Sequence, residues 1–319
     1  MSIDLRPIGK ADIPAMARLH VAAEAVDDTG EHYNEADLEE ELSNPDIELG
    51  KDVVGAFDGD DLVGYCSVML RKDDDDPKGY CFGLTRPDRR GEGIGTRLAE
   101  AMLARAAELQ RAGGRPLRVL CNGLATNQAQ AELMTDFGMA PERWSFGMRI
   151  TLGDVPPAPA FPDGYVVRGY SDGDGERWRV AHNIAFRDHP NFSAWDATEW
   201  QQWVTGSRNF RPALSYFVTP QGEPDSIAAY VQTNEYDAYQ EATGRREAYV
   251  GKVGTLPDHR GRGLATLLLK YCLAAYQAAG YDEASLDVDS ENPTGALGIY
   301  ERAGFRTERR YASYARTIG

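Results

Sequence analysis

The chain has 319 residues, of which 42% are hydrophobic and 26% charged, which excludes a disordered chain and gives enough length for two domains. Its formal net charge of −16 argues against a nucleic-acid partner, whose phosphates would be repelled. No stretch reaches the length of a membrane span, residues 1–12 lack the apolar core of a signal peptide, and the four cysteines lack metal-type spacing. We therefore expect a cytoplasmic protein without membrane contact or bound metal.

The first half begins with IDLRPIGKADIPAMARLHVAAE, whose pattern predicts a short strand followed by a helix. Further along, TRPDRRGEGIG ends in a basic, glycine-rich turn in front of a long apolar stretch. The half closes at TLGDVPPAPAFPDG, whose four prolines favour an extended, semi-rigid connection. These features predict one domain over residues 1–152 and a second over residues 163–319.

The second half opens with YVVRGYSDGDGERWRVAHNIAF, again a predicted strand and helix. An apolar run over 228–231 and a run rich in Tyr and Val over 247–256 predict two further strands. After the turn HRGRGLA, apolar residues at helical spacing predict a helix that stops at Gly280. ASLDVD predicts a strand, and Asn292, followed by proline, predicts the start of a helix that ends at Gly304.

The two halves repeat each other. Arg90 and Arg260 lie 170 residues apart, in TRPDRRGEGIG and TLPDHRGRGLA, which share a threonine, a proline and an aspartate at the same offset. The segments that follow also correspond, LRVLCNGLATNQAQAELMTDFGM to ASLDVDSENPTGALGIYERAGF. A repeat of this length predicts two domains of one fold.

Both turns have the features of an anion-binding site. Amides at the start of a helix lack intrahelical partners, and the helix dipole makes that end electropositive. Gly261 and Gly263 leave room for a phosphate to approach, while Arg260 and Arg262 add positive charge. Neither turn fits a P-loop or a dinucleotide-binding motif. A turn that only starts a helix is the competing interpretation, and its occurrence in two equivalent places favours phosphate binding.

The pattern Arg-x-x-Gly-x-Gly/Ala between a strand and a long helix resembles the coenzyme A pyrophosphate loop of the GNAT acetyltransferase superfamily. Both loops match it, and NPTGALGIYERAGF is similar to the second helix motif of that superfamily. The matches extend over both halves, so the chain resembles a tandem GNAT protein. The resemblance implies an α/β fold with two tandem domains, each a mixed, mostly antiparallel sheet flanked by helices. It also implies acetyl-CoA as the acyl donor, without a metal.

The resemblance assigns particular residues to the coenzyme. In the second half these are Val253, Thr255, Arg260, Gly261, Arg262, Gly263, Leu264, Ala265, Thr266 and Asn292, and in the first half Gly83, Thr85, Arg90, Gly91, Gly93 and Gly95. The strand over 253–255 would bond the pantetheine arm through its backbone, and one of its amides would polarise the thioester carbonyl. Tyr300 would protonate the departing thiolate. Aromatic packing beside Phe305 is the alternative role for Tyr300.

The first half departs from this pattern at the proton donor. Aligning the two glycines that end the helices places Met134 at the position of Tyr300, whereas aligning the two asparagines that begin them places Thr135 there. Neither side chain is a phenolic acid. We therefore expect the first domain to keep its phosphate loop but to be catalytically degenerate, and the second domain to carry the chemistry.

The general base and the acceptor pocket have weaker signals. A carboxylate on the central strands would take the acceptor's proton, and Glu235 and Glu247 stand at the ends of two predicted strands. Each is also compatible with a surface position at the end of a hairpin. The stretch AHNIAFRDHPNFSAWDATEWQQW, rich in histidine and aromatic residues, would form the acceptor pocket. Core packing is the favoured interpretation for its tryptophans, and Asp196 with Glu199 forms a predicted capping box.

The residues and the resemblance together predict an N-acetyltransferase that moves the acetyl group of acetyl-CoA directly to the amine of a small molecule or peptide. We expect it to act as a monomer or homodimer, and its acidic charge favours a cationic acceptor. A pair of coenzyme A-binding or interaction modules without turnover is the alternative. Tyr300, inside an intact helix motif, favours the enzyme.

Overall fold

The computed structural model of the chain describes residues 3–71, 76–189, 192–290 and 295–319. The chain divides into two compact units. The N-terminal unit is Met1–Trp144 with Arg310–Gly319, and the C-terminal unit is Ser145–Arg309. Each unit is an α/β structure in which helices cover both faces of a mixed sheet, which confirms the predicted fold class.

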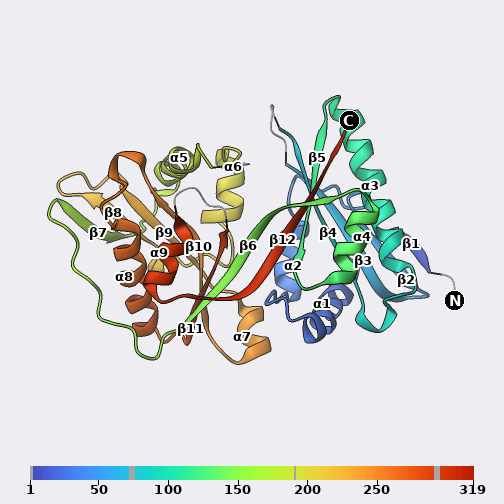
Figure 1. Cartoon of the computed structure of the whole chain (residues 1–319), viewed down its shortest axis with the longest axis horizontal. Helices are drawn as coiled ribbons and strands as arrows, with labels where there is room; N and C mark the ends of the chain where they lie inside the picture. Colours follow the sequence, from blue (N-terminus) through green and yellow to red (C-terminus); the bar gives the residue numbers. More distant parts are fainter. Residues whose placement is uncertain (1–2, 72–75, 190–191, 291–294) are drawn as a thin grey trace. The chain divides into compact units, whose positions relative to one another are not determined.

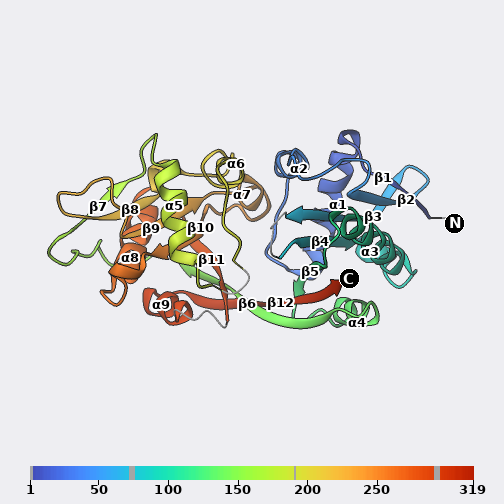
Figure 2. The same ribbon diagram turned by 90° about the horizontal axis from the view of Figure 1, so that it is seen from above.

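In the N-terminal unit, the pair β4 and β5 runs parallel and the other described pairs run antiparallel. The strands in spatial order are β1 (Asp4–Pro7), β2 (Val53–Asp58), β3 (Asp61–Arg71), β4 (Lys78–Thr85), β5 (Leu117–Leu124) and the end of β12 (Arg306–Ile318). The helices are α1 (Ile13–Asp27), α2 (Glu35–Leu42), α3 (Ile94–Gly113) and α4 (Gln128–Asp136). The first two helices and the last two contribute to separate cores, and Figure 2 shows α2 and α4 on opposite sides of β4 and β5.

The C-terminal unit repeats this plan, with β10 and β11 as its parallel pair. In spatial order its strands are the end of β6 (Ala140–Thr151), β11 (Glu283–Asp289), β10 (Glu247–Thr255), β9 (Ala229–Asn234), β8 (Tyr216–Pro220) and β7 (Tyr165–Gly169). Its helices, labelled in Figure 1, are α5 (Gly175–Phe186), α6 (Ala197–Trp200), α7 (Asp237–Thr243), α8 (Leu264–Ala278) and α9 (Ala296–Ala303). Helices α8 and α9 pack on one face of the sheet, and α5 and α6 pack on the other.

The two units exchange their last strands. Residues 145–151 of β6, which end the first half of the sequence, pair with β11 of the C-terminal unit. Residues 311–318 of β12, which end the chain, pair with β5 of the N-terminal unit. The compact units therefore differ from the sequence halves 1–152 and 163–319 in these two segments.

Strand β9 shows how the sequence forms the two cores of the C-terminal unit. Ala229 and Val231 belong to the cluster around α8, whereas Tyr230 between them belongs to the cluster around α5 and α6. Successive side chains of a strand point to opposite faces, so the alternation follows from the sequence. Every residue of β9 is buried because helices cover both faces of the sheet.

The elements predicted around the second turn are confirmed. Helix α8 buries the predicted apolar stripe, which includes Leu264, Leu268 and Cys272. Strand β11 contains the whole of ASLDVD, and α9 ends at a C-cap, Gly304, with a φ of +107°. The predicted helix start at Asn292 lies outside the described residues.

The aromatic stretch of the second half contributes mainly to a core, as predicted for its tryptophans. Trp200 is 2% exposed and packs with Trp178, whose ring centroid lies 5.5 Å away. Asp196 and Glu199 form the predicted capping box of α6, with reciprocal bonds of 2.8 and 3.2 Å between their side chains and backbone amides. His182 and Phe186, on α5, border both this core and a cavity.

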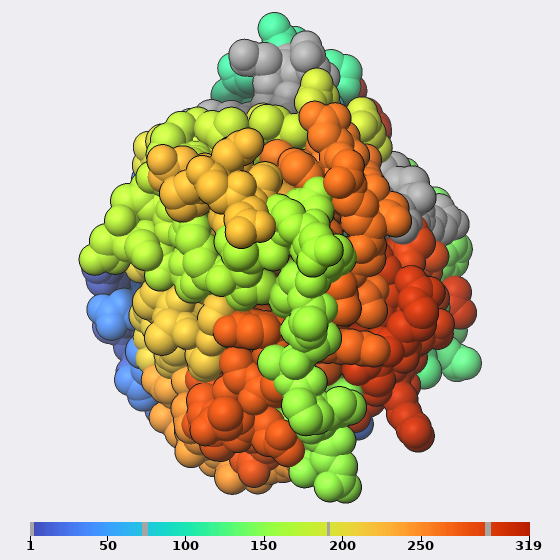
Figure 3. All heavy atoms as spheres, turned by 90° about the vertical axis from the view of Figure 1, so that its left-hand side faces the viewer, coloured from blue at the N-terminus to red at the C-terminus, as the bar shows by residue number. Residues whose placement is uncertain are grey.

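The proline-rich connection lies along α8. The Gln277 side chain donates to the carbonyls of Leu152 and Gly153, over 2.7 and 2.9 Å. The Phe161 ring meets the ring of Tyr271 edge-on, with 6.3 Å between centroids. Figure 3 shows this segment, in green, crossing the surface of the C-terminal unit. These contacts fix the connection to the unit that follows it.

Two further properties concern the part of the chain that the structure describes. No helix there combines the length and apolar character needed to cross a membrane. No group of three or more His, Cys, Asp or Glu side chains there is arranged to hold a metal ion. The four cysteines are buried free thiols.

Candidate active site

Strands β10 and β11 pair at their beginning and then separate. Their parallel pairing runs from Glu247 opposite Glu283 to Tyr249 opposite Ser285 and stops there. Beyond this point, no described strand occupies that edge of β10, while its other edge stays paired with β9 as far as Thr255. The free edge can hydrogen-bond an extended ligand in the way that a strand would.

A cavity of about 850 Å³ opens where the two strands separate. It brings together most of the coenzyme residues predicted for the second half and the predicted acid. These lining residues are Val253, Thr255, Arg260, Gly261, Gly263, Leu264, Ala265, Thr266 and Tyr300. Arg262 is not among the lining residues, and Asn292 lies outside the described residues.

The turn before α8 has the backbone shape of an anion cradle. Gly261 and Gly263 both have a φ of +75°, a conformation that favours glycine, and no atom outside the neighbouring residues lies within 4 Å of the place where a Cβ would stand. Gly263 is the N-cap of a 15-residue helix whose first amides have no intrahelical acceptor. This combination of open space, free amides and helix dipole suits a phosphate group.

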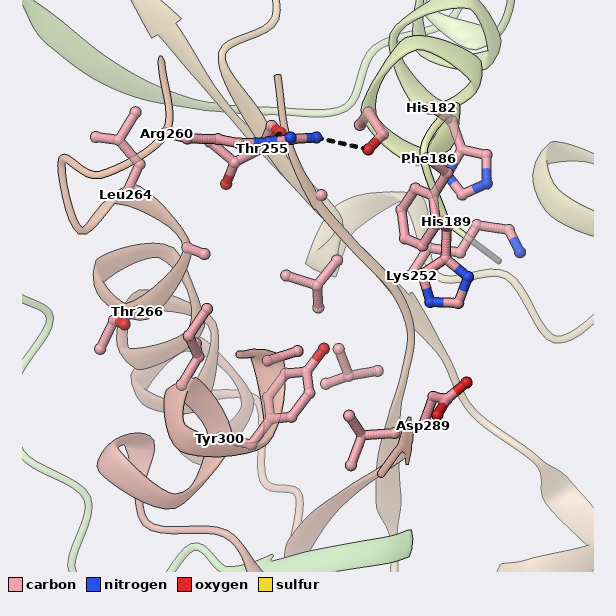
Figure 4. A pocket seen from close by; sticks show the side chains of 18 of the residues that line it. His182, Phe186, His189, Lys252, Thr255, Arg260, Leu264, Thr266, Asp289 and Tyr300 are labelled. Carbon is pink, nitrogen blue, oxygen red and sulfur yellow. Dashed lines mark hydrogen bonds between the residues drawn. The ribbon is translucent and has the colours of Figure 1, made fainter. Parts of the chain in front are cut away.

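The two arginines of this turn have different positions. The Arg260 guanidinium donates to the carbonyl of Thr255 over 3.2 Å and to the carbonyl of Ala185, at the end of α5, over 2.8 Å (Figure 4). It therefore joins the turn to α5 while lining the cavity. Arg262 lies with its guanidinium carbon 5.8 Å from the centroid of the Tyr165 ring and does not line the cavity. Neither arginine makes an ion pair with a carboxylate of the described residues.

The corresponding turn of the N-terminal unit has the same backbone but a different charge balance. Gly91 and Gly93 both have a φ of +80° and open space beside them. Arg90 donates to both oxygens of Asp27, over 2.7 and 2.6 Å, and also to the Thr85 carbonyl. The neighbouring Arg89 pairs with Glu92 and with an aspartate of β2. Carboxylates thus neutralise the cations of this turn.

The other two predicted residues of the first half also differ in their surroundings. Gly83 lies on β4, and no atom outside the neighbouring residues lies within 4 Å of its Cβ position. Gly95, in the first turn of α3, faces Leu133 of α4, whose side chain would lie 3.5 Å from a Cβ. Gly83 therefore lies beside open space, whereas Gly95 permits close helix packing.

Tyr300 projects from α9 into the cavity (Figure 4). The residue is 9% exposed, and its ring lies edge-on to Phe305 with 6.3 Å between centroids. Burial raises the pKa of its hydroxyl to about 12. That hydroxyl has no hydrogen-bond partner among the described residues, whereas a buried phenol ordinarily has one. Tyr300 therefore does pack against an aromatic ring, but its protonated hydroxyl still points into the cavity, where it can donate to a bound ligand.

Glu235 and Glu247 do not line the cavity, and both are buried rather than placed on the surface. Burial opposes the charge of Glu235, but bonds from Tyr281 (2.6 Å), Arg211 (2.8 Å) and Arg246 (3.0 Å) lower its pKa. Burial raises the pKa of Glu247 although Arg149 bonds to it. Each carboxylate is therefore engaged by arginine away from the cavity.

The cavity also contains further polar residues. Asp287 and Asp289 line it from β11 and Lys252 from β10, and the sequence analysis missed these three. Asp188 and His189 line it from the segment after α5, within the stretch predicted to form the acceptor pocket. The signal for the two aspartates was present in ASLDVD, because polar residues alternate there with apolar ones. Leu286 and Val288 belong to the α8 core, so the aspartates point to the other face.

Gly254 of β10 and Tyr230 of β9 lie against each other on the face of the sheet that α5 covers. A Cβ at position 254 would lie 2.2 Å from the Tyr230 ring, so only glycine fits there. The Tyr230 hydroxyl lies 2.8 Å from Nδ1 of His182, which lines the cavity. Tyr65 and His20 form a similar pair in the N-terminal unit, where the hydroxyl lies 2.7 Å from Nε2 of the histidine. This repeated pair was not visible as a sequence motif.

Comparisons with known proteins agree with this geometry. The model of the acetyltransferase (GNAT) family matches residues 18–139 and 178–305. Proteins named mycothiol acetyltransferase are similar, at 32% identity in Thermobispora bispora over 78% of each chain and at 30% in Nocardia farcinica over 94% of this chain and 93% of that one. A GCN5-related N-acetyltransferase from Sphaerobacter thermophilus superposes with a TM-score of 0.79, at 25% identity over 99% of this chain and 95% of that one. A tandem GNAT protein from the clavulanic acid biosynthesis pathway shares the fold, with a TM-score of 0.70 over 100% of this chain and 99% of that one, at 19% identity.

Proposed function

Since this chain belongs to the acetyltransferase (GNAT) family and is an acetyl-CoA-dependent N-acetyltransferase, we propose that its C-terminal unit carries out the acetyl transfer to the amine of a small molecule. The observation that carries the proposal is the Tyr300 hydroxyl. It is buried, protonated and without a described partner, and it faces the same cavity as the glycine turn of α8. A binding module without turnover would not need such a donor.

The donor would occupy the cavity from the α8 side. Its pyrophosphate would accept hydrogen bonds from the amides of Gly263 and the first residues of α8, where the helix dipole is favourable. The pantetheine arm would extend along the free edge of β10, as an added strand does. An amide of β10 would then polarise the thioester carbonyl.

Tyr300 would act as the general acid in this arrangement. Its raised pKa keeps the phenol protonated over the whole physiological range, which is the form that donates to a departing thiolate. Neither Met134 nor Thr135, the residues of the N-terminal unit aligned with Tyr300, is a phenolic donor, and carboxylates neutralise the cations of that unit's turn. We therefore assign turnover to the C-terminal unit and a weaker, non-catalytic coenzyme site to the N-terminal one.

We infer the class of the acceptor from the names of the relatives and from the net charge of the chain. The relatives are named for mycothiol, a small molecule, so its unacetylated amine is one acceptor to test here. The chain's net charge of −16 also favours acceptors that carry an additional cationic group, such as polyamines and amino sugars.

The test is the release of free thiol from acetyl-CoA with a panel of amines that contains these compounds and basic peptides. Mass spectrometry of the product should show one acetyl group on an amine nitrogen. Acetyl-CoA binding without thiol release for any member of the panel would favour the binding module instead.

A further inference from the structure

Asp287 lines the cavity just beyond the point where β10 and β11 separate. It stands on β11 two residues beyond Ser285, which is the last residue of that strand paired with β10. It lines the same cavity as Tyr300 but lies on the opposite face of β11 from Leu286 and Val288, which pack against α8. Asp287 thus lines the cavity from one side of the sheet, and the glycine turn before α8, where we propose that the donor binds, lines it from the other side.

A tyrosine holds this carboxylate in place. The Tyr249 hydroxyl donates to Oδ2 of Asp287 over 2.9 Å, and the Tyr249 ring lies edge-on to Tyr236 with 5.7 Å between centroids. Within the described ranges, no lysine, arginine or histidine forms an ion pair with Asp287. Glu235 and Glu247 differ in this respect, because arginines bond to both.

The surroundings also change the acidity of Asp287. Asp287 is an exposed residue whose carboxylate is open to the cavity, but the protein atoms around it still raise its pKa, against the Tyr249 bond, which lowers it. A carboxylate whose pKa moves toward neutrality is a better proton acceptor near physiological pH than an ordinary one.

We propose that Asp287 is the general base that takes a proton from the acceptor's ammonium group, and that Tyr249 is its positioning residue. The inference rests on acetyl transfer in the C-terminal unit, as proposed above. It replaces Glu235 and Glu247 as candidates for the base, since neither of them reaches the cavity.

The proton and electron transfers then balance. The ammonium group gives one proton to Asp287 and becomes a neutral amine, whose lone pair attacks the thioester carbonyl carbon. The new C–N bond forms, the C–S bond breaks, and the departing thiolate takes the proton of Tyr300. The acylated nitrogen loses its surplus proton to solvent, from which Tyr300 regains one, and Asp287 releases its proton. The products are an amide, a free thiol and one proton.

Several charged or titratable groups bond to Asp287 or line the same cavity and will contribute to its pH dependence. They come from β10, β11 and the segment after α5, and they are Tyr249, Lys252, Asp289, Asp188 and His189. A pH profile therefore needs variants that distinguish Asp287 from this background.

The experiment is the pH dependence of kcat/KM for wild type, Asp287→Asn and Tyr249→Phe with an accepted amine. Asp287→Asn should reduce kcat by about 10²–10⁴-fold with unchanged acetyl-CoA affinity. The acidic limb of the pH profile of Asp287→Asn should move to the pKa of the acceptor's own amine, because only the neutral amine then reacts. Tyr249→Phe removes a bond that lowers the pKa of Asp287, so its acidic limb should move to higher pH.

Glu235→Gln and Glu247→Gln provide the matched comparison. Both variants remove a buried carboxylate, and both should keep the wild-type acidic limb even where they lower the melting temperature. An unchanged limb in Asp287→Asn, or its loss in either glutamine variant, would overturn the assignment of Asp287 while leaving acetyl transfer intact. Absence of any acetylated product from the wild type would overturn the proposed function and this inference with it.

Discussion

Met134 and Tyr300 occupy equivalent positions in the two units. Each lies four residues before a glycine in the left-handed region, Gly138 with a φ of +72° and Gly304 with a φ of +107°. In both cases the amide of the residue after that glycine donates to the carbonyl of Met134 or Tyr300, over 2.9 and 3.1 Å. Of the two sequence alignments considered, the structure therefore supports the one that matches Tyr300 with Met134, which is buried in the N-terminal core.

Replacing Tyr300 with phenylalanine should separate its chemical role from its packing. The ring and its contact with Phe305 remain, so the melting temperature and the acetyl-CoA affinity should change little. Turnover should fall by about 10²–10⁴-fold, the range expected for a lost general acid. Steady-state thiol release checks the rate and calorimetry checks the affinity. Full activity in Tyr300→Phe would refute the assignment.

The two glycine turns offer a matched pair of variants, Gly263→Ala and Gly93→Ala. Both positions have a φ near +80° and open space, so alanine should strain both turns by a similar amount, about 1 kcal/mol. Only Gly263→Ala should reduce turnover strongly, because its methyl group would crowd the donor's pyrophosphate. Steady-state rates of the two folded proteins make the comparison. The reverse outcome would place the active site in the N-terminal unit.

Calorimetric titration with coenzyme A should show one tight site and a second at least about tenfold weaker. The N-terminal turn has the same backbone, but Asp27 and Glu92 neutralise its arginines. Glu92→Gln removes one of the carboxylates of this turn and should strengthen the weak site by about 0.3–1 kcal/mol, as expected for one charge near a helix N-terminus. Two sites of equal affinity in the wild type would contradict this charge argument.

The strand exchange predicts where two core substitutions will act. Tyr314, near the end of the chain, lies in the N-terminal core, and Met148, from the first half of the sequence, lies in the C-terminal core. Tyr314→Ala and Met148→Ala should each reduce the free energy of unfolding by about 2–5 kcal/mol. Hydrogen exchange should show lost protection in the N-terminal unit for the first and in the C-terminal unit for the second. The opposite distribution would show that each half keeps its own last strand.

Local sequence features predicted the elements beside the motifs well. The glycine turn, the stripe of α8, the ASLDVD strand and the end of α9 depend on residues within about twenty positions of one another, so their signals are short-range. The backbone shape of the turn follows from them, because glycine positions and a helix start determine it.

The features that the sequence did not predict depend on contacts between residues that lie far apart in the chain. Glu247 is buried because Arg149, 98 residues earlier, bonds to it, and no local pattern indicates such a partner. Tyr249 and Asp287 meet only because β10 and β11 lie side by side. The exchange of β6 and β12 was also hidden, since both segments have ordinary strand patterns that do not specify which sheet they join.

The exchange of β6 and β12 has a consequence for the evolution of the two halves. After a gene duplicates, the copy that loses its catalytic group is usually free to decay or be deleted. Here, deletion of the first copy would also remove residues 145–151, which pair with β11, the strand that carries Asp287. Selection on the half to which we assign turnover therefore extends into the coding sequence of the other half. The first half, which has Met134 in place of Tyr300, can persist because it encodes a strand that pairs with β11 of the second half.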